Sequence, residues 1–313
     1  MTYRDAFVKL YVLGLFGFGV CRKKPLYSCL KGVGQMPNKA YLEITNVCNL
    51  SCSFCHGTSR PPRFITEEKF TAAAKRLRPF ADYLYFHLMG EPLLHPSLGR
   101  FFEIAADLGF KVILTTNGTL LKEREAVLLS APALHKVSIS LHCYEVNSMG
   151  KSLDEYLGDC FDFCEKAADR GIYAVMRLWN IGGEDKLNQT ILGAMHHRFD
   201  GQWEERYSGY RLAHRIFLEW GNRFDWPDIN GEYKGDAHSC YGLRNQIGVL
   251  CDGTVVPCCL DAEGAIPLGN IFDADIQEIL AAPRAINLKR SLENRRVCEE
   301  LCRRCGYGMD NFK

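Results

Sequence analysis

Three closely spaced cysteines, Cys48, Cys52 and Cys55, constrain this chain more than any other feature. Gaps of three and then two residues allow three thiolates to hold three corners of an iron–sulfur cube and leave the fourth iron open. An open iron can take a small ligand through its amine and carboxylate, and the aromatic Phe54 fits that use. The pattern predicts a 4Fe-4S cluster, with a zinc site completed by His56 or another cysteine as the alternative.

Length and composition agree with a folded, soluble enzyme, and a cytoplasmic location is expected from the exposed clusters. The 313 residues are 47% hydrophobic and 24% charged, with a formal net charge of +1. This charge gives no argument for nucleic-acid binding, and no nucleic-acid partner is predicted. Fifteen cysteines without a secretory signal favour metal binding over a disulfide framework. The apolar run 11–20 is about half the length of a membrane span, so it predicts a packed helix rather than a transmembrane segment, with a peripheral membrane contact as the alternative.

From about residue 39 to residue 200, β-rich runs alternate with helical stretches, as in βα units with a parallel sheet. Strands are predicted over 41–45, 83–88, 111–116, 136–141, 173–179 and 214–220. Helices are predicted over 67–77, 97–108, 123–129 and 153–169. Ligands of such sheets gather at the carboxyl ends of the strands, which is where the cysteine loop would lie.

The cysteine run, together with Gly90-Glu91-Pro92 after the second predicted strand, resembles the radical S-adenosylmethionine (SAM) superfamily. The resemblance implies an α/β fold, a partial (β/α)6 TIM-like barrel. In the family this turn reads Gly-Gly-Glu-Pro and its backbone meets the amino group of SAM, whereas this chain has Met89 at the first glycine. Gly90 could allow close approach to the ligand, and Glu91 could accept from the ammonium or hold the loop. An ordinary strand-ending turn is the alternative.

Polar residues at later strand ends complete a plausible SAM site. By resemblance, Ser140 is a candidate contact to the carboxylate or ribose of SAM, and Asn117 either belongs to the site or caps a turn. Relatives often place an arginine after strand four, where this chain offers Lys151, and Arg177 on strand five is the favoured substitute. The candidate cofactor-binding residues are Phe54, Gly90, Glu91, Asn117, Ser140 and Arg177.

A second group of cysteines follows a change of composition at 226–231, which predicts a linker. We expect a helical N-terminal extension over 1–38, a core over 39–225 and a small cysteine-rich hairpin-plus-helix domain over 226–313. The spacing of Cys240, Gly253 and Cys258 resembles the opening of SPASM and twitch domains, with a hairpin formed by 245–250 and 254–257 and a helix over 275–280. The resemblance implies one auxiliary 4Fe-4S cluster held by Cys240, Cys258, Cys302 and Cys305.

Two alternatives stay open at that second site. Cys259 and Cys298 compete as ligands, because adjacent or slightly shifted thiols cannot be ranked from sequence. A structural zinc held by four cysteines is the other possibility.

The resemblance implies a radical SAM enzyme that cleaves SAM reductively to a 5′-deoxyadenosyl radical and takes hydrogen from a small-molecule or peptide substrate. Its electron donor would be a flavodoxin or ferredoxin. An electron accepted by the auxiliary cluster would make the reaction a two-electron oxidation. A redox-neutral lyase similar to queuine lyase, a peptide-modifying maturase and a non-catalytic metal-binding scaffold are alternatives. No catalytic acid or base is predicted, but Glu43, Tyr85, His87 and His142 are candidates for inward-facing residues.

Overall fold

The computed structural model describes residues 39–237 and 239–307. The predicted N-terminal extension, with its apolar run 11–20, lies outside the described residues. Within the described ranges, every helix is too short or too polar to cross a lipid bilayer.

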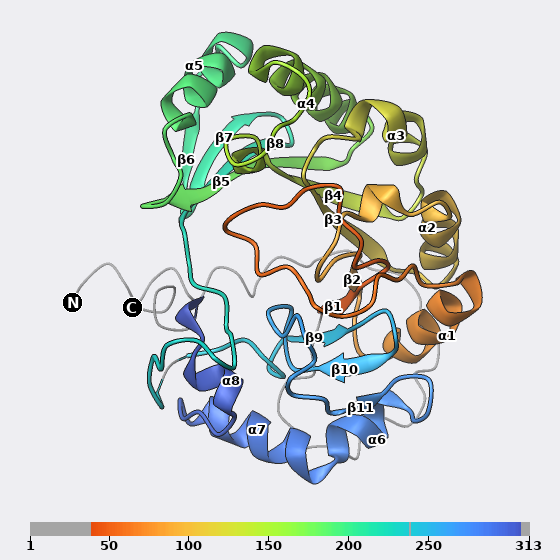
Figure 1. Ribbon diagram of the computed structural model, residues 1–313. Coiled ribbons are helices and arrows are strands. Elements are labelled where there is room, and N and C mark those ends of the chain that lie inside the picture. Colours follow the sequence, from red (N-terminus) through yellow and green to blue (C-terminus); the bar gives the residue numbers. More distant parts are fainter. Residues whose placement is uncertain (1–38, 238, 308–313) are drawn as a thin grey trace, which may run out of the picture. The chain divides into compact units, whose positions relative to one another are not determined.

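The described residues form one sheet of eleven strands in the order β11-β10-β9-β1-β2-β3-β4-β5-β8-β7-β6 (Figure 1). Six neighbouring strands run parallel: β1 (Lys39–Leu42), β2 (Tyr83–Tyr85), β3 (Lys111–Thr116), β4 (Leu134–Ser140), β5 (Tyr173–Ile181) and β8 (Ile216–Asn222). They correspond to the six predicted strands. The fold class is therefore confirmed: these strands are the parallel core of a TIM-like α/β fold.

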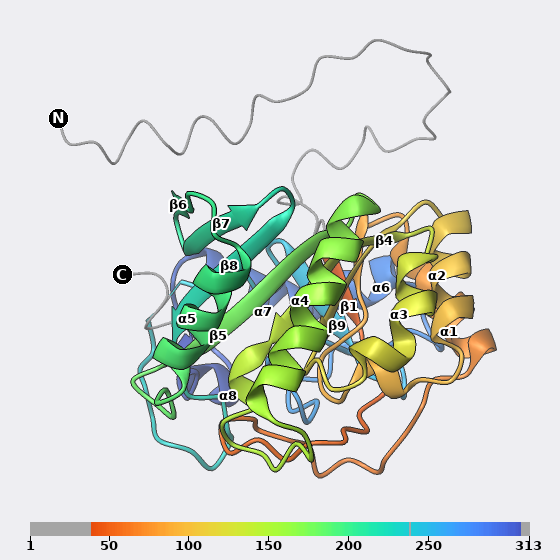
Figure 2. The same cartoon turned by 90° about the horizontal axis from the view of Figure 1, so that it is seen from above.

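Helices connect these strands and follow one another along the same side of the sheet (Figures 1 and 2). They are α1 (Glu67–Leu77), α2 (Leu98–Asp107), α3 (Leu121–Leu129), α4 (Leu153–Asp169) and α5 (Asn188–Arg198), with short 3-10 turns η1 (Pro92–Leu94) and η2 (Leu141–Cys143). Helix α1 begins after Thr66, whose side chain accepts from the Lys69 N–H. Phe70 of this helix stacks on Phe101 of α2, with ring centroids 4.1 Å apart. Phe70 also packs edge-on against Phe86, which follows β2, so these rings join the two helices to the sheet.

The strands have an apolar outer face and a largely polar inner face. Successive side chains of a strand point to opposite sides. On β1, Ala40 and Leu42 are buried in the core under the helices, so Lys39 and Tyr41 face the other way. On β4, Val137 and Ile139 belong to the same core, which leaves Ser138 on the inner face. The inner face therefore carries the groups that can meet a ligand.

The cysteine-rich C-terminal segment extends the sheet of the core. Strand β9 (Gln246–Val249) pairs in parallel with β1, and β10 (Thr254–Val256) returns antiparallel to it, followed by β11 (Gly269–Asn270). The predicted hairpin is thus present. Three helices follow, α6 (Ile276–Ala281), α7 (Pro283–Glu293) and α8 (Glu300–Arg303), drawn in blue in Figure 1. The domain bounds 39–225 and 226–313 stay a prediction.

The directions of these strands place the two cysteine groups at opposite ends of β1. The loop with Cys48 leaves the carboxyl end of β1. On the other side, Gly248 of β9 lies beside Tyr41, and Val256 of the antiparallel β10 lies beside Gly248. The chain then continues toward the amino end of β1, where Cys258 follows. The space between the two groups is the interior of the barrel.

An antiparallel hairpin, β6 (Glu204–Arg206) and β7 (Gly209–Ala213), extends the sheet at the opposite edge beside β8. The sequence analysis did not predict it. All three residues of β6 are exposed, so this strand lacks the buried alternating pattern by which strands are recognised.

A buried ion pair joins the cysteine loop to the C-terminal segment. Glu43 is fully buried, and the Arg60 guanidinium donates to both of its carboxylate oxygens, at 2.6 and 2.9 Å. The Arg60 Nε donates to the Ala262 carbonyl at 2.8 Å, and the Cys251 N–H donates to Glu43 at 3.0 Å. Glu43 is thus committed to a structural contact and does not line the cavity described below.

We predict that Arg60→Met destabilises the fold by about 3 to 5 kcal/mol, because it leaves the Glu43 carboxylate buried without its cation. Arg100→Met is the matched control: Arg100 pairs with Glu67 and Glu103 on the surface, where such pairs contribute about 1 kcal/mol or less. Denaturant unfolding of both variants measures the difference. Equal decreases in the free energy of unfolding would show that the Arg60–Glu43 pair stabilises the fold no more than a surface pair does.

Candidate functional site

A cavity of about 360 Å³ lies in the barrel interior. Tyr85 and His87 reach it from the end of β2, and Phe54 reaches it from the cysteine loop. Cysteines of the C-terminal segment form another part of its wall. One chamber therefore contacts both cysteine groups that the sequence singled out.

The three cysteines of the first group are free thiols on one loop. The Cys52 sulfur accepts from Asn147 Nδ2 at 3.1 Å, and the Cys55 sulfur accepts from the Gly57 N–H at 3.4 Å. A hydrogen bond from the Cys143 thiol is the main cause that lowers the pKa of Cys52 to about 7. Burial raises the pKa of Cys48, and the charges of Cys52 and Cys55 raise it further. In their deprotonated form these cysteines lie close enough to repel one another, and bound iron ions would remove that repulsion.

The donor set therefore fits a cluster. Within the described ranges, no three His, Cys, Asp or Glu side chains converge closely enough to hold one metal ion. A cluster needs its thiolates spread around several irons, and three cysteines on a short exposed loop can meet that need.

Gly90 packs against the backbone of the cysteine loop. Its φ is +76°, and a Cβ at this position would lie 2.5 Å from the Thr45 carbonyl oxygen and 2.8 Å from that of Val47. The next N–H, of Glu91, donates to the Val47 carbonyl at 2.8 Å. The glycine is required here by the close approach of two chain segments. A contact of this turn with SAM stays a prediction.

The Glu91 carboxylate holds the ends of β2 and β3 together. It is 1% exposed and accepts from the Leu93 N–H at 3.0 Å, the Thr116 hydroxyl at 2.8 Å and the Asn117 N–H at 2.7 Å. Burial raises its pKa to about 7, although the three donors act in the opposite direction. These hydrogen bonds hold the loop, which is one of the two roles considered for Glu91, and a contact with the ammonium of SAM stays a prediction.

Asn117 also supports the cysteine loop. Its amide Nδ2 donates to Asn49 Oδ1 at 2.9 Å, and its Oδ1 accepts from the Thr119 N–H at 3.0 Å. The second contact is the turn cap that the sequence offered as an alternative. The first connects the end of β3 to the loop that carries Cys48.

Ser140 and Arg177 both line the cavity. The Arg177 Nε lies 2.9 Å from a Glu219 oxygen, and its guanidinium lies over the Trp179 ring, 4.7 Å from the centroid. Arg177 is therefore already paired, and a role as partner of the SAM carboxylate stays a prediction. The other cation considered, Lys151, lies 2.9 Å from Asp159.

Four predicted ligands of the second group come together. Cys240, Cys258, Cys302 and Cys305 line the same cavity. Burial raises the pKa of Cys258 well above its usual value, and the charges of Cys240 and other neighbouring thiols add to this effect. Since these thiols do not converge on one metal ion, their arrangement suits a cluster, whose ligands lie around several irons.

The competing cysteines lie differently. Cys259 also lines the cavity, but it takes part in a hydrogen bond with the Tyr41 side chain and lies near the Lys39 ammonium. Cys298 is exposed and does not contact the cavity. The geometry favours the four predicted ligands, which remain a prediction.

Sequence reasoning missed several residues that line the cavity, among them Lys39, Tyr41 and Trp179. The alternation along β1 could have found the first two, because Ala40 and Leu42 are apolar and both neighbouring positions carry polar tips. Of the four candidates for inward-facing residues, Tyr85, His87 and His142 line the cavity and Glu43 does not.

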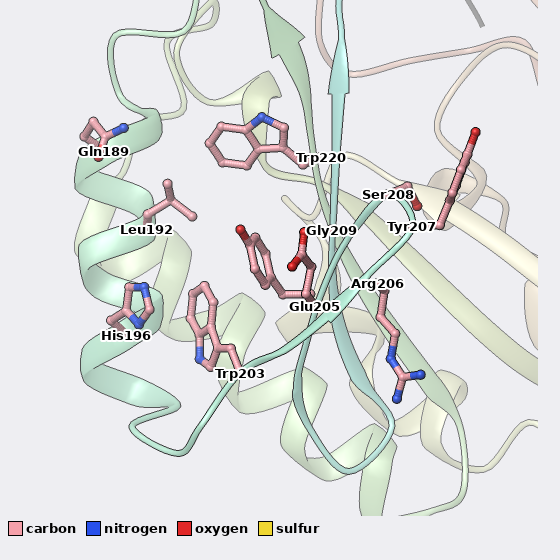
Figure 3. A pocket seen from close by; sticks show the side chains of 11 residues that line it. Gln189, Leu192, His196, Trp203, Glu205, Arg206, Tyr207, Ser208, Gly209 and Trp220 are labelled. Atoms are coloured by element: carbon pink, nitrogen blue, oxygen red, sulfur yellow. The ribbon is translucent and has the colours of Figure 1, made fainter. Parts of the chain in front are cut away.

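A second cavity of about 620 Å³ lies between α5 and the β6–β7 hairpin (Figure 3). Trp203 stacks on His196 there, with ring centroids 3.7 Å apart. None of the predicted cluster or cofactor residues lines it. The chemistry therefore points to the barrel cavity.

Two family models match the chain. The model of the radical SAM superfamily matches residues 42–187, and that of the SPASM iron–sulfur cluster-binding domain matches residues 240–306. Together they cover about two thirds of the chain.

Among curated proteins, two similar relatives come from Bacillus subtilis. The sporulation killing factor maturation protein SkfB is 23% identical over 290 residues, which span 83% of this chain and 68% of SkfB. The antilisterial bacteriocin subtilosin biosynthesis protein AlbA is 24% identical over 282 residues, 79% of this chain and 60% of AlbA. The alignments leave about a third or more of each relative uncovered.

Solved structures share the fold. BtrN in complex with AdoMet and 2-DOIA aligns with a TM-score of 0.57 at 16% identity, over 87% of this chain and 94% of BtrN. The structure of anSMEcpe with bound AdoMet aligns with a TM-score of 0.56 at 16% identity, over 87% of this chain and 84% of the other. With both domain models matched, this chain belongs to the radical SAM superfamily, as an enzyme that uses SAM, a 4Fe-4S cluster and an auxiliary iron–sulfur cluster in its SPASM domain.

Proposed function

We propose that this enzyme cleaves SAM reductively to a 5′-deoxyadenosyl radical and uses it to take hydrogen from a substrate held in the barrel cavity, in a two-electron oxidation assisted by the auxiliary cluster. One observation carries the proposal. Phe54 from the first cysteine loop and the cysteines of the second group line a single chamber of about 360 Å³. A substrate in that chamber would lie between the two clusters.

In this proposal Cys48, Cys52 and Cys55 hold the first cluster, and Cys240, Cys258, Cys302 and Cys305 hold the second. When bound, the clusters and SAM supply the reducing electron, the radical and an acceptor for the substrate electron. In the proposal, aromatic side chains of the cavity wall limit the access of water to the reaction: they are Tyr41, Tyr85, Trp179, Phe224 and Trp226. Such a wall protects a reactive intermediate from side reactions.

Two histidines in the wall are uncharged at physiological pH. Burial, assisted by the charge of Arg177, lowers the pKa of His87 to about 3. Burial also lowers the pKa of His142 to about 4, and its ring lies 4.7 Å from that of Phe54. Neutral imidazoles can orient a substrate by hydrogen bonds without adding charge.

For the substrate we propose a peptide, with a small molecule as the second possibility. The names of SkfB and AlbA describe maturation of a killing factor and biosynthesis of a bacteriocin, and their alignments span most of this chain. A redox-neutral outcome, as in a lyase, is the alternative reaction. A flavodoxin or ferredoxin as electron donor and a cytoplasmic location are further parts of the proposal.

We predict that anaerobically reconstituted protein, given SAM and a strong reductant, forms 5′-deoxyadenosine, and that Cys52→Ala forms none because the first cluster loses a ligand. Chromatographic quantification of the nucleoside measures both. The matched control is Cys164→Ala, since Cys164 is a buried thiol of α4 outside the cavity. Product from Cys52→Ala at the native rate would contradict the proposal.

We predict that Gly90→Ala abolishes 5′-deoxyadenosine formation, because the new Cβ displaces the backbone that carries Cys48. The control is Gly109→Ala, which has the same φ of +76° but only ordinary contacts, the nearest at 3.8 Å. Both variants bear the cost of a left-handed alanine, about 1 to 2 kcal/mol. If Gly90→Ala and Gly109→Ala retain the cluster and the activity equally, the close packing of Gly90 is not needed for activity.

We predict that Cys302→Ser lowers the iron content of the reconstituted protein from about eight to about four per chain, because one of two 4Fe-4S clusters is lost. Cys298→Ser, which changes an exposed thiol outside the cavity, should leave about eight. Iron and sulfide analysis after anaerobic reconstitution measures both. The reverse pattern would assign Cys298 as the ligand.

A further inference from the structure

A polar row crosses the inner face of three neighbouring strands. The register pairs Tyr85 with Ile113 and Thr115 with Ser138, so His87, two residues after Tyr85, lies level with Thr115. His87 Nε2 lies 3.2 Å from the Thr115 hydroxyl oxygen. His87 and Thr115 line the barrel cavity, and Ser138 is fully buried on the same face.

Two atoms of this row have no hydrogen-bond partner among the described residues: His87 Nδ1 and Ser138 Oγ, both buried. Buried polar atoms of folded proteins nearly always have a partner, and an orphan requires an explanation. His87 lines the cavity and Ser138 does not, so it is the orphan nitrogen of His87 that points to a ligand in the cavity.

The hydrogen bonds around Thr115 favour one of the two neutral tautomers of His87. Arg177 Nη1 lies 3.4 Å from the Thr115 oxygen, and a guanidinium can only donate. The Thr115 hydroxyl proton is then free to point to His87 Nε2. With Nε2 as acceptor, a neutral imidazole carries its proton on Nδ1. In this tautomer the unpartnered Nδ1 is a donor.

The charges of the cavity wall select the partner of that donor. Lys39, Arg177 and Arg223 line the cavity, and no aspartate or glutamate does so within the described residues. Glu219 and Glu184 pair with the two arginines. The Lys39 ammonium lies 6.0 Å from the Tyr85 ring centroid and has no carboxylate within ion-pair distance in the described part of the chain. Apart from the cysteines, the charged side chains of the wall are thus cationic, and they attract oxygen atoms that carry negative or partial negative charge.

We infer that His87, oriented by Thr115, donates its Nδ1–H to an acyl oxygen of the substrate, the C=O of an amide or a carboxylate. This inference rests on the proposed function, since it takes the barrel cavity as the substrate chamber. A peptide bond or an acidic side chain supplies such an oxygen. His87 is then a positioning residue that sets which part of the substrate faces the radical.

The test is nuclear magnetic resonance of the full chain labelled with ¹⁵N-histidine and ¹⁵N-tryptophan, with its clusters reconstituted in the oxidised state. His87→Asn identifies the His87 signals. We expect the Nδ1–H tautomer in the native chain and a mixture of tautomers in Thr115→Val, which removes the hydroxyl. An Nε2–H tautomer in the native chain would overturn the inference, because Nδ1 would then be an acceptor.

Three probes test the partner: acetate, N-methylacetamide and ethylammonium chloride, compared at equal ionic strength. We expect the two acyl compounds to shift the His87 Nδ1 and Trp179 indole signals with saturation, and ethylammonium to shift neither. If acetate alone shifts the signals, the partner of His87 is a carboxylate. If acetate and N-methylacetamide both shift them, the partner can be any acyl oxygen. If no probe acts on Nδ1, the N–H donates only to the neighbouring Tyr41 ring, whose centroid is 5.4 Å away, and the inference is wrong.

His87→Asn should lower the affinity of the acyl probes roughly tenfold, the effect of one lost hydrogen bond, as measured by titration of the Trp179 indole signal. The matched control is His135→Asn, because His135 contacts aromatic rings on the same sheet but does not line the cavity. If His87→Asn lowers the affinity for SAM as much as it lowers the affinity for the acyl probes, the His87 N–H donates to the cofactor and the inference is overturned. These signals do not depend on SAM cleavage, so failure of 5′-deoxyadenosine formation is a separate result.

Discussion

Strand β1 hydrogen-bonds to β2 on one side and to β9 on the other, and the position of both cysteine groups depends on this double pairing. Pairing with β2 places β1 in the parallel core, so the loop after β1 lies at the end of the sheet where ligands bind. Pairing with β9 brings the C-terminal hairpin to the same strand. Because β10 runs back antiparallel, Cys258 lies toward the opposite end of β1.

The polar groups near the site divide into two kinds. Glu43, Glu91 and Arg177 have their partners within the chain and hold segments together, because a buried charge without a partner costs several kcal/mol. His87 and Ser138 have atoms without partners. Of these residues His87 lines the cavity, as does Lys39, so both are placed to meet a substrate there.

Much of the fold could be predicted because periodicity reports burial. Helices 67–77 and 153–169 agree with α1 and α4, and the six parallel strands fall where alternating or apolar runs predict them. The β6–β7 hairpin escaped prediction because its first strand is exposed on both faces. Glu43 was a candidate for the cavity, but Arg60, seventeen residues later in the chain, covers it. A contact of that kind has no local signal.

The sequence by itself determined the chemistry. Cysteine spacing acts through a few consecutive residues, so Cys48, Cys52 and Cys55 must share one loop wherever the chain folds. The tertiary structure decided which distant groups face one another. Cys258 and Cys259 cannot be ranked from the sequence, but in the fold they have different neighbours. Cys258 lies near Cys240, Cys302 and Cys305, whereas Cys259 lies near Cys305 and also takes part in a hydrogen bond with Tyr41. Which of the two binds the cluster stays a prediction. The difference in neighbours depends on the pairing of β9 with β1, which joins segments two hundred residues apart and cannot be read from either one.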